Sequence, residues 1–231
     1  MSTSKKPIIL SFDGNIGSGK STIVKYLESN FENYYNQKNS TNNLKICFLQ
    51  EPVSIWEKII DQKTNKNLIE CFYSDNEKYS FAFQMMAYIS RLSIFNKALK
   101  ENYDVIITER SLFTDKNIFA KMLYDTNKMN SVEYQIYIKW FDEFTESFKN
   151  MKIVYIKTEP ETCFNRIVNR NRKGENIKMS YLKNCHLYHE LWLNNIDINK
   201  ILTINGNNDI NINISFEYFN LIMEKVYNFI I

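Results

Sequence analysis

Five short segments of mostly apolar, often β-branched residues are spread along the chain: 7–12, 44–49, 104–108, 152–157 and 200–204. Segments of this kind, without polar alternation, are typical of strands buried on both faces of a parallel sheet. Apolar residues recur at helical spacing between them, most clearly over 77–100 and 131–148. The pattern predicts an α/β fold with a five-stranded parallel sheet flanked by helices, in a single domain spanning 1–231. Residues 33–43 are polar, which predicts a flexible loop.

Composition narrows the classes of protein. The chain has 231 residues, of which 44% are hydrophobic and 24% charged, so it has enough apolar residues for a folded core. Its net charge of +3 comes from interspersed signs, so we expect no nucleic-acid polymer as a partner. The sequence has no apolar segment of about 18 residues and no apolar N-terminal stretch, which favours a cytoplasmic protein without a membrane anchor. The four cysteines lack C-x-x-C spacing, so neither a zinc site nor a disulfide scaffold is expected.

A glycine-rich loop directly follows the first predicted strand. Residues 14–21 match the phosphate-loop pattern G-x-x-x-x-G-K-[ST], and apolar residues at helical spacing come next. In such a loop, backbone N–H groups surround phosphate oxygens, a lysine reaches the β- and γ-phosphates and a hydroxyl ligates Mg²⁺. A glycine-rich turn without a ligand is the alternative. The predicted nucleotide-binding residues are Gly14, Asn15, Ile16, Gly17, Ser18, Gly19, Lys20, Ser21 and Thr22.

The residues at the ends of the next two predicted strands help to distinguish between classes of phosphate-loop protein. The second strand ends near Glu51, where a carboxylate could act as a general base, although a surface glutamate is the alternative. The third strand ends in Glu109-Arg110-Ser111 rather than in the Asp or Asp-Glu that is usual in motor ATPases. The guanine-reading pattern N-K-x-D is absent from the sequence, which weakens a GTPase hypothesis.

Several motifs together resemble one family. Residues 51–56, 80–84, 109–111 and 160–163 are similar to successive motifs of the deoxynucleoside kinases related to deoxycytidine and deoxyguanosine kinase, and the resemblance runs from Ile8 to about Phe229. It implies a P-loop kinase fold, ATP as phosphoryl donor, Mg²⁺ and a homodimer packed through helices. Thymidylate kinases are the nearest alternative, but they usually carry Asp where this chain has Ile16. A nucleoside monophosphate kinase and a non-catalytic nucleotide-binding regulator therefore stay open.

The resemblance also implies roles for individual residues. Glu51 would take the proton from the deoxyribose 5′-hydroxyl, and Arg110 would hold that oxygen and the transferring phosphoryl group. Glu109 would support Mg²⁺ beside Ser21 or act as a second carboxylate. The implied nucleoside-binding residues are Tyr73 and Glu175 at the 3′-hydroxyl, Gln84 at the base edge, Trp56, Phe83 and Phe119 around the base, and Ala87, Arg91 and Asp115 in selecting it.

Helical spacing supports part of the nucleoside site. Gln84, Ala87 and Arg91 are spaced i, i+3 and i+7, so they share one face of the predicted helix. A buried glutamine and arginine need polar partners, which a nucleobase edge would provide. The alternative is that Arg91 points to solvent. The set Ala87, Arg91 and Asp115 resembles that of family members accepting cytosine and purine deoxynucleosides, so deoxycytidine, deoxyadenosine or deoxyguanosine is expected over thymidine.

Three arginines lie close together after the fourth predicted strand. Arg166, Arg170 and Arg172 would repel one another unless an anion lies among them, and in the family this segment is a lid over the phosphates, here at about 166–180. An exposed basic loop is the alternative. The five arginines of the chain all have a proposed ligand role, although lysine is far more frequent. By the same resemblance, Asn208, Asp209 and Ile210 form the loop beside the donor base.

Overall fold

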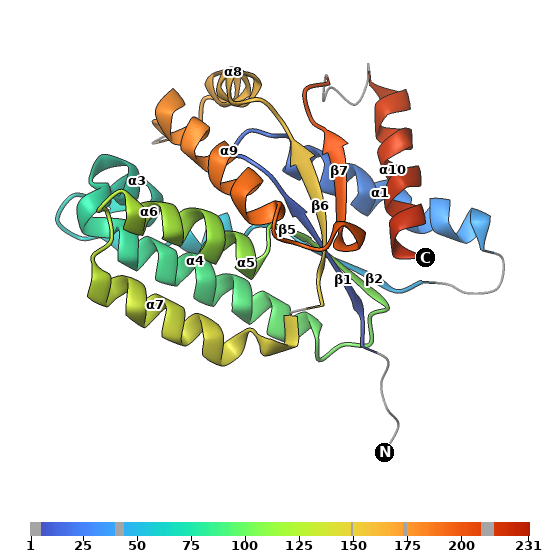
Figure 1. Ribbon diagram of the computed structural model, residues 1–231, viewed down its shortest axis with the longest axis horizontal. Helices are drawn as coiled ribbons and strands as arrows, with labels where there is room; N and C mark the ends of the chain where they lie inside the picture. The colour runs from blue at the N-terminus through green and yellow to red at the C-terminus, as the bar shows by residue number, and fades with distance from the viewer. Residues whose placement is uncertain (1–5, 40–43, 149, 173–174, 209–214) are drawn as a thin grey trace.

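A five-stranded parallel sheet forms the centre of the protein (Figure 1). The computed structural model describes residues 6–39, 44–148, 150–172, 175–208 and 215–231. The strand order is β2-β5-β1-β6-β7, and the bounds are β1 (Ile8–Asp13), β2 (Ile46–Leu49), β5 (Val105–Glu109), β6 (Lys152–Lys157) and β7 (Ile201–Asn205). The predicted sheet and the α/β class are therefore confirmed. The single domain over 1–231 stays a prediction.

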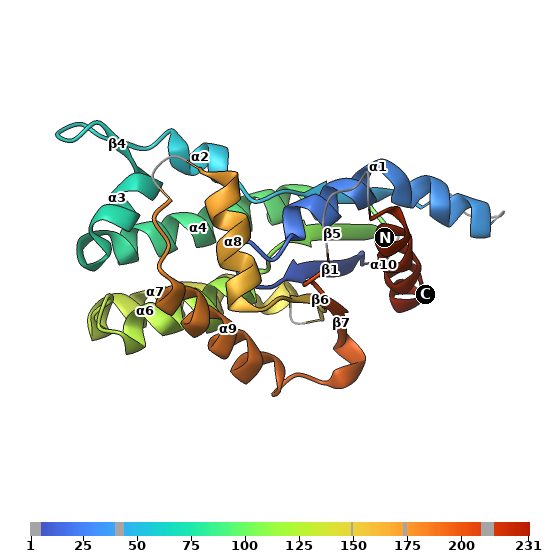
Figure 2. The same cartoon turned by 90° about the horizontal axis from the view of Figure 1, so that it is seen from above.

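Helices cover both faces of this sheet. Their bounds are α1 (Lys20–Lys38), α2 (Val53–Glu57), α3 (Leu68–Ser74), α4 (Asn76–Ala98), α5 (Leu112–Thr114), α6 (Lys121–Asp125), α7 (Ser131–Phe144), α8 (Pro160–Arg170), α9 (Met179–Leu193) and α10 (Phe216–Ile230). A π-helical segment (Asp115–Ala120) joins α5 to α6, and 3₁₀ turns occupy Glu146–Phe148 and Ile198–Lys200. Figure 2 shows α3, α4, α6 and α7 extending to one side of the molecule, away from α1 and α10.

Alternate residues of β1 pack into two different cores, as a strand buried on both faces requires. Leu10 and Phe12 belong to the core under α1 and α10, whereas Ile9 belongs to the core under α4 and α7. In the parallel register Phe12 lies beside Glu109 and Asp13 beside Tyr155. The carboxyl ends of the central strands therefore meet at one edge, where side chains from loops distant in sequence come together.

Two local expectations were wrong, and one small element was not expected. Helix α1 continues through residues 33–38 because Tyr34 and Tyr35 pack on Tyr227 of α10, with ring centroids 5.9 and 5.6 Å apart; residues 40–43 lie outside the described part of the chain. The helix expected over 131–148 ends at Phe144, and a 3₁₀ turn follows it. A small antiparallel hairpin, β3 (Ile60–Asp61) and β4 (Lys66–Asn67), was not expected at all, because its strands are too short to give a pattern.

Within the described ranges, no helix combines the length and the apolar character that crossing a membrane requires. The cytoplasmic location and the absence of a nucleic-acid partner stay predictions.

Candidate active site

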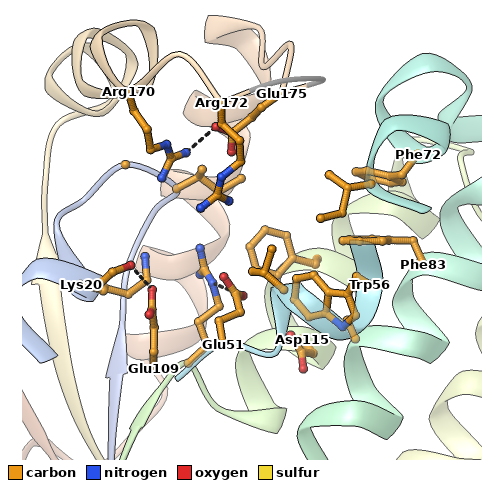
Figure 3. A pocket seen from close by; sticks show the side chains of 18 of the residues that line it. Lys20, Glu51, Trp56, Phe72, Phe83, Glu109, Asp115, Arg170, Arg172 and Glu175 are labelled. Carbon is orange, nitrogen blue, oxygen red and sulfur yellow. Dashed lines mark hydrogen bonds and ion pairs between the residues drawn. The ribbon is translucent and has the colours of Figure 1, made fainter. Parts of the chain in front are cut away.

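One cavity of about 460 Å³ lies at the carboxyl edge of the sheet and brings together residues from most of the chain (Figure 3). Its wall is built by the phosphate loop and α1, the ends of β2 and β5, helices α2, α3 and α4, and the segment that begins on α8. The predicted site residues that line it are Ile16, Gly17, Gly19, Lys20, Ser21, Thr22, Glu51, Trp56, Tyr73, Phe83, Gln84, Ala87, Arg91, Glu109, Arg110, Asp115, Phe119, Arg166, Arg170, Arg172 and Glu175.

The cavity has two chemically different ends. Figure 3 shows Lys20 and Glu109 at one end, the aromatic rings of Trp56, Phe72 and Phe83 at the other, and the Glu51 carboxylate between them. A charged end built on a phosphate loop is suited to phosphate groups, and an aromatic end is suited to a flat apolar ring. The arrangement fits a ligand pair that meets near Glu51.

The phosphate loop needs its glycines. Gly14 and Gly17 have φ values of +147° and +78°, which side chains rarely adopt. A Cβ on Gly14 would lie 2.6 Å from the carbonyl oxygen of Ile156, and one on Gly17 would lie 2.6 Å from that of Cys163. The loop is thus packed tightly against β6 and α8, and α1 begins directly after it at Lys20 with its N-terminus toward the cavity.

Lys20 is buried at the phosphate end. Its Nζ donates to the carbonyl oxygens of Gly14 and Asn15 at 3.0 and 2.7 Å and to Ser18 Oγ at 3.2 Å. Burial, together with the nearby Arg110 guanidinium, lowers the pKa of Lys20 to about 7. Oxygen atoms of the loop thus accept from all three N–H donors of the Lys20 ammonium group. A phosphate bound nearby would favour the charged form of Lys20.

Ser21 and Glu109 provide oxygen atoms next to Lys20. Ser21 Oγ donates to Glu109 Oε1 at 2.6 Å, and both residues line the cavity. Hydroxyl and carboxylate oxygens are the ligands that Mg²⁺ prefers, usually in small number beside water and phosphate oxygens. In the described residues, no cluster of three or more His, Cys, Asp or Glu side chains forms a protein-only metal site. The pair therefore fits a metal ion held mainly by its nucleotide.

Glu51 lies between two arginines. Its Oε1 is 3.1 Å from Arg91 Nη2 and 3.3 Å from Arg110 Nε. Burial alone would raise the pKa of Glu51, but Arg110, Arg91 and Lys20 together outweigh that effect and lower it. Glu51 is therefore ionised at neutral pH and is not the isolated surface glutamate that was the alternative.

Arg91 is buried, with 1% of its surface exposed, so the alternative in which it points to solvent is wrong. Its Nε donates to Asp115 Oδ2 at 2.9 Å, and its Nη1 donates to the carbonyl oxygen of Glu109 at 2.9 Å. With Glu51, these contacts join α4, the end of β5 and the π-helical segment through one side chain. Only the planar, multidentate guanidinium can make all three contacts.

Arg110 has a left-handed backbone, with φ of +66°. This conformation costs a non-glycine residue roughly 1–3 kcal/mol and is concentrated at functional sites. The side chain donates through Nη1 to the carbonyl oxygen of Gly14 at 2.9 Å, and its guanidinium lies 4.9 Å from the ring centre of Phe119. Arg110 thus connects the phosphate loop, Glu51 and the aromatic end.

The aromatic end of the cavity consists of packed rings and the side-chain amide of Gln84. Phe83 lies nearly parallel to Phe72 at 4.6 Å and is contacted edge-on by Trp56 at 5.5 Å. The indole of Trp56 is fixed by a hydrogen bond of 2.9 Å to Ser90 Oγ. Gln84 Oε1 is buried, and within the described residues it has no hydrogen-bond partner. Native buried polar atoms are nearly always paired, so an oxygen without a partner on a residue that lines the cavity is unusual.

Residues at the mouth of the cavity bind one another. Arg170 Nη2 donates to Glu175 Oε2 at 2.6 Å, and burial together with nearby Glu175 raises the pKa of Tyr73. Arg166 donates to the carbonyl oxygens of Ser18 and Asn208 at 3.1 and 2.6 Å. Asp209 and Ile210 lie outside the described residues, and the lid at about 166–180 stays a prediction.

Some phosphate-loop residues face away from the cavity, and some cavity residues were not predicted. Gly14, Asn15 and Ser18 are not part of its wall, and Asn15 Nδ2 instead donates to the carbonyl oxygen of Leu182 at 2.9 Å. The unpredicted lining residues are Lys25, Val53, Ile69, Phe72 and Tyr181. The i, i+3, i+4 spacing of Ile69, Phe72 and Tyr73 could have revealed the aromatic face of α3.

A phosphate loop that shares one cavity with a carboxylate and an aromatic end is the arrangement expected of a P-loop phosphotransferase with a small-molecule acceptor. The family model described as deoxynucleoside kinase matches residues 10–231. A probable deoxycytidine kinase of fowlpox virus is 35% identical over 208 residues, covering 87% of this chain and 79% of that protein.

Two vertebrate relatives are also named as deoxynucleoside kinases. The deoxycytidine kinase of Homo sapiens is 34% identical and covers 80% of this chain and 74% of its own length. The mitochondrial deoxyguanosine kinase of Xenopus laevis is 32% identical and covers 80% and 72%. The chain therefore belongs to the deoxynucleoside kinase family. It is a deoxynucleoside kinase, which confirms the enzyme hypothesis over the non-catalytic regulator and the monophosphate kinase.

Proposed function

We propose that this kinase transfers the γ-phosphoryl group of ATP to the 5′-hydroxyl of deoxycytidine, deoxyadenosine or deoxyguanosine in preference to thymidine, and so supplies monophosphates in nucleotide salvage. The observation that carries the proposal is the position of Glu51, between the phosphate loop and the aromatic end of one cavity. A base at that position can contact an acceptor hydroxyl while the donor phosphates lie on the loop.

Glu51 acts as the general base. Its carboxylate accepts the proton of the 5′-hydroxyl as the oxygen attacks the γ-phosphorus, and the bond from that phosphorus to the leaving oxygen of ADP breaks. The two arginines keep the base ionised beforehand, since they hold its pKa low. Arg110 lies between Glu51 and Gly14 O, where its charge stabilises the transferring phosphoryl group.

The donor end positions the triphosphate. Backbone N–H groups of the phosphate loop and the Lys20 ammonium bind its oxygens, while Arg166, Arg170 and Arg172 border the same cavity as a lid. Ser21 and Glu109 would hold Mg²⁺, which would neutralise charge on the phosphate oxygens. The resemblance assigns Asn208, Asp209 and Ile210 to the loop beside the donor base, and the carbonyl oxygen of Asn208 accepts a hydrogen bond from Arg166.

The acceptor end recognises the nucleoside. The Gln84 amide pairs with the base edge, which gives its buried Oε1 the partner that it lacks. Trp56, Phe83 and Phe119 enclose the base, and Tyr73 and Glu175 bind the 3′-hydroxyl. The rigid Arg91–Asp115 pair beside Ala87 restricts the space for a 5-methyl group, which disfavours thymidine.

A homodimer through α4 and α7 completes the proposal. Val132, Ile136 and Trp140 form an exposed i, i+4, i+8 row on α7, and the Phe144 ring stacks on that of Trp140 at 5.6 Å. Ile89 on neighbouring α4 is also exposed. Contiguous exposed apolar side chains of this size mark an association surface.

The activity is tested by kcat/KM for the four deoxynucleosides and for their monophosphates with ATP and Mg²⁺. We expect turnover of deoxycytidine and the purine deoxynucleosides and little of any monophosphate. Glu51→Gln should lower kcat by about 10²-fold or more with KM nearly unchanged. A preference for thymidine would contradict only the assigned base, whereas near-normal turnover of Glu51→Gln would remove Glu51 as the base.

A further inference from the structure

Asp13 carries a buried carboxylate that the proposed mechanism does not use. It is the last residue of β1, it is completely buried, and it is not part of the cavity wall. Among the described residues, no lysine or arginine pairs with it. Its Oδ2 accepts a hydrogen bond from Ser11 Oγ at 2.6 Å, and its Oδ1 accepts from the backbone N–H of Ser111 at 3.2 Å and from Thr114 Oγ1. Because burying a carboxylate is costly, its presence at this position calls for a structural reason.

The reason lies in the residue that precedes Ser111. Arg110 has the unfavourable left-handed backbone, and hydrogen bonds fix it on both sides. Its N–H donates to the carbonyl oxygen of Phe12 at 3.1 Å, and its own carbonyl oxygen accepts from Thr108 Oγ1 at 3.0 Å. Asp13 Oδ1 holds the next N–H along the chain. Hydrogen bonds therefore hold both peptide groups that flank Arg110 in this turn.

The same turn sets where the Arg110 side chain points. Its guanidinium reaches Gly14 O at 2.9 Å and Glu51 at 3.3 Å, so a rotation of the backbone at residue 110 would move it away from both. A direct catalytic role for Asp13 is excluded by its position, because its oxygens are occupied and do not face the cavity.

We infer that Asp13 is a positioning residue that holds the Ser111 N–H, and with it the left-handed turn that aims the Arg110 guanidinium between the phosphate loop and Glu51. This inference rests on the proposed role of Arg110. Asp13 acts on the rate of transfer and not on affinity, because it touches neither ligand position.

Three variants test the inference. Asp13→Ala removes all three hydrogen bonds. Thr114→Val removes one of the bonds to Oδ1, together with the hydrogen bond between Thr114 Oγ1 and Ser111 Oγ, with little change of shape. We expect kcat to fall about 10–100-fold in Asp13→Ala and about 3–10-fold in Thr114→Val, with both KM values within about threefold, because small displacements of catalytic groups have large effects on rate. Asp13→Asn keeps an acceptor oxygen and should restore kcat to within about fivefold of the original enzyme.

A double-mutant cycle separates positioning from general damage, and an exposed aspartate serves as a control for the loss of a carboxylate. Asp197→Ala removes another carboxylate that accepts a backbone N–H, from Asn199 at 3.0 Å, remote from the cavity, and should leave kcat unchanged. In an Arg110→Ala background, Asp13→Ala should lower kcat no further, because the two act through one group. Equal losses in both backgrounds, or normal kcat in folded Asp13→Ala and Thr114→Val, would overturn the inference. Normal kcat in Arg110→Ala would instead refute the proposed role of Arg110.

Discussion

The guanidinium of Arg91 donates to the Asp115 carboxylate at 2.9 Å, and both side chains are buried beside the cavity. The same guanidinium contacts Glu51, so one residue joins the part of the site that selects the base to the part that transfers the proton. Base recognition and catalysis are consequently coupled through a single side chain.

Arg91→Lys tests that coupling. A lysine has the same charge, but it cannot reach Asp115, Glu51 and the Glu109 carbonyl oxygen at once. We expect kcat/KM for deoxycytidine to fall about 10²-fold, through both a lower kcat and a higher KM. Steady-state kinetics measure the effect, and a change in KM alone would show that Arg91 serves base binding only.

The pH dependence of ATP binding reports on Lys20. In the free enzyme its pKa is lowered to about 7, and bound phosphates would raise it again. Above pH 7, binding must therefore be accompanied by proton uptake, so affinity should weaken by up to about tenfold per pH unit as the pH rises toward the bound-state pKa. Calorimetry in two buffers of different ionisation enthalpy detects that uptake. An affinity independent of pH between 7 and 9 would show that Lys20 is already fully charged.

Gln84→Met should change stability and activity in opposite directions. The substitution removes a buried oxygen that has no partner among the described residues, which should stabilise the free enzyme by about 1 kcal/mol or more. It also removes the proposed contact with the base edge, so kcat/KM should fall at least about 10²-fold. Thermal unfolding with and without deoxycytidine tests both effects. A less stable variant with normal kinetics would mean that Gln84 serves packing.

The association surface on α7 can be tested without affecting the site. Trp140 is 50% exposed, and Trp140→Glu should place a charge in the proposed dimer interface and give a monomer in sedimentation experiments. The control is Leu191→Glu on α9, because Leu191 is similarly exposed at 55% but lies outside α4 and α7. If both variants keep the oligomeric state of the original protein, this face is not the interface.

The sheet, one helix face and the phosphate loop could be predicted from the sequence for physical reasons. The sheet was predictable because strands buried on both faces must be apolar throughout, and the shared face of Gln84 and Arg91 follows from helical geometry. The phosphate loop was predictable because Gly14 and Gly17 approach neighbouring backbone so closely that a side chain would not fit. In each of these cases the local sequence carries the constraint.

The remaining features depend on contacts between distant segments. The left-handed backbone of Arg110 is stabilised by residues of β1 and β5, so no local pattern indicates it. Phe72 belongs to the site through its stacking on Phe83, which is part of another helix. The ion pair of Arg170 with Glu175 joins two residues for which the sequence predicts two different ligands. Such relationships require the tertiary structure.

The close approach of Gly17 to the Cys163 carbonyl oxygen has a mechanical consequence. The space between them cannot hold even a methyl group, and Arg166 of α8 also donates a hydrogen bond to Ser18 O of the loop. Helix α8 and the phosphate loop are therefore in direct contact at two points, which opposes sliding of one past the other. A shift of α8 must therefore carry the loop with it. Arg166 thus keeps its position relative to the loop, whereas Arg172 lies beyond the left-handed residue Asn171 and, among the described residues, its side chain makes no hydrogen bond to the loop.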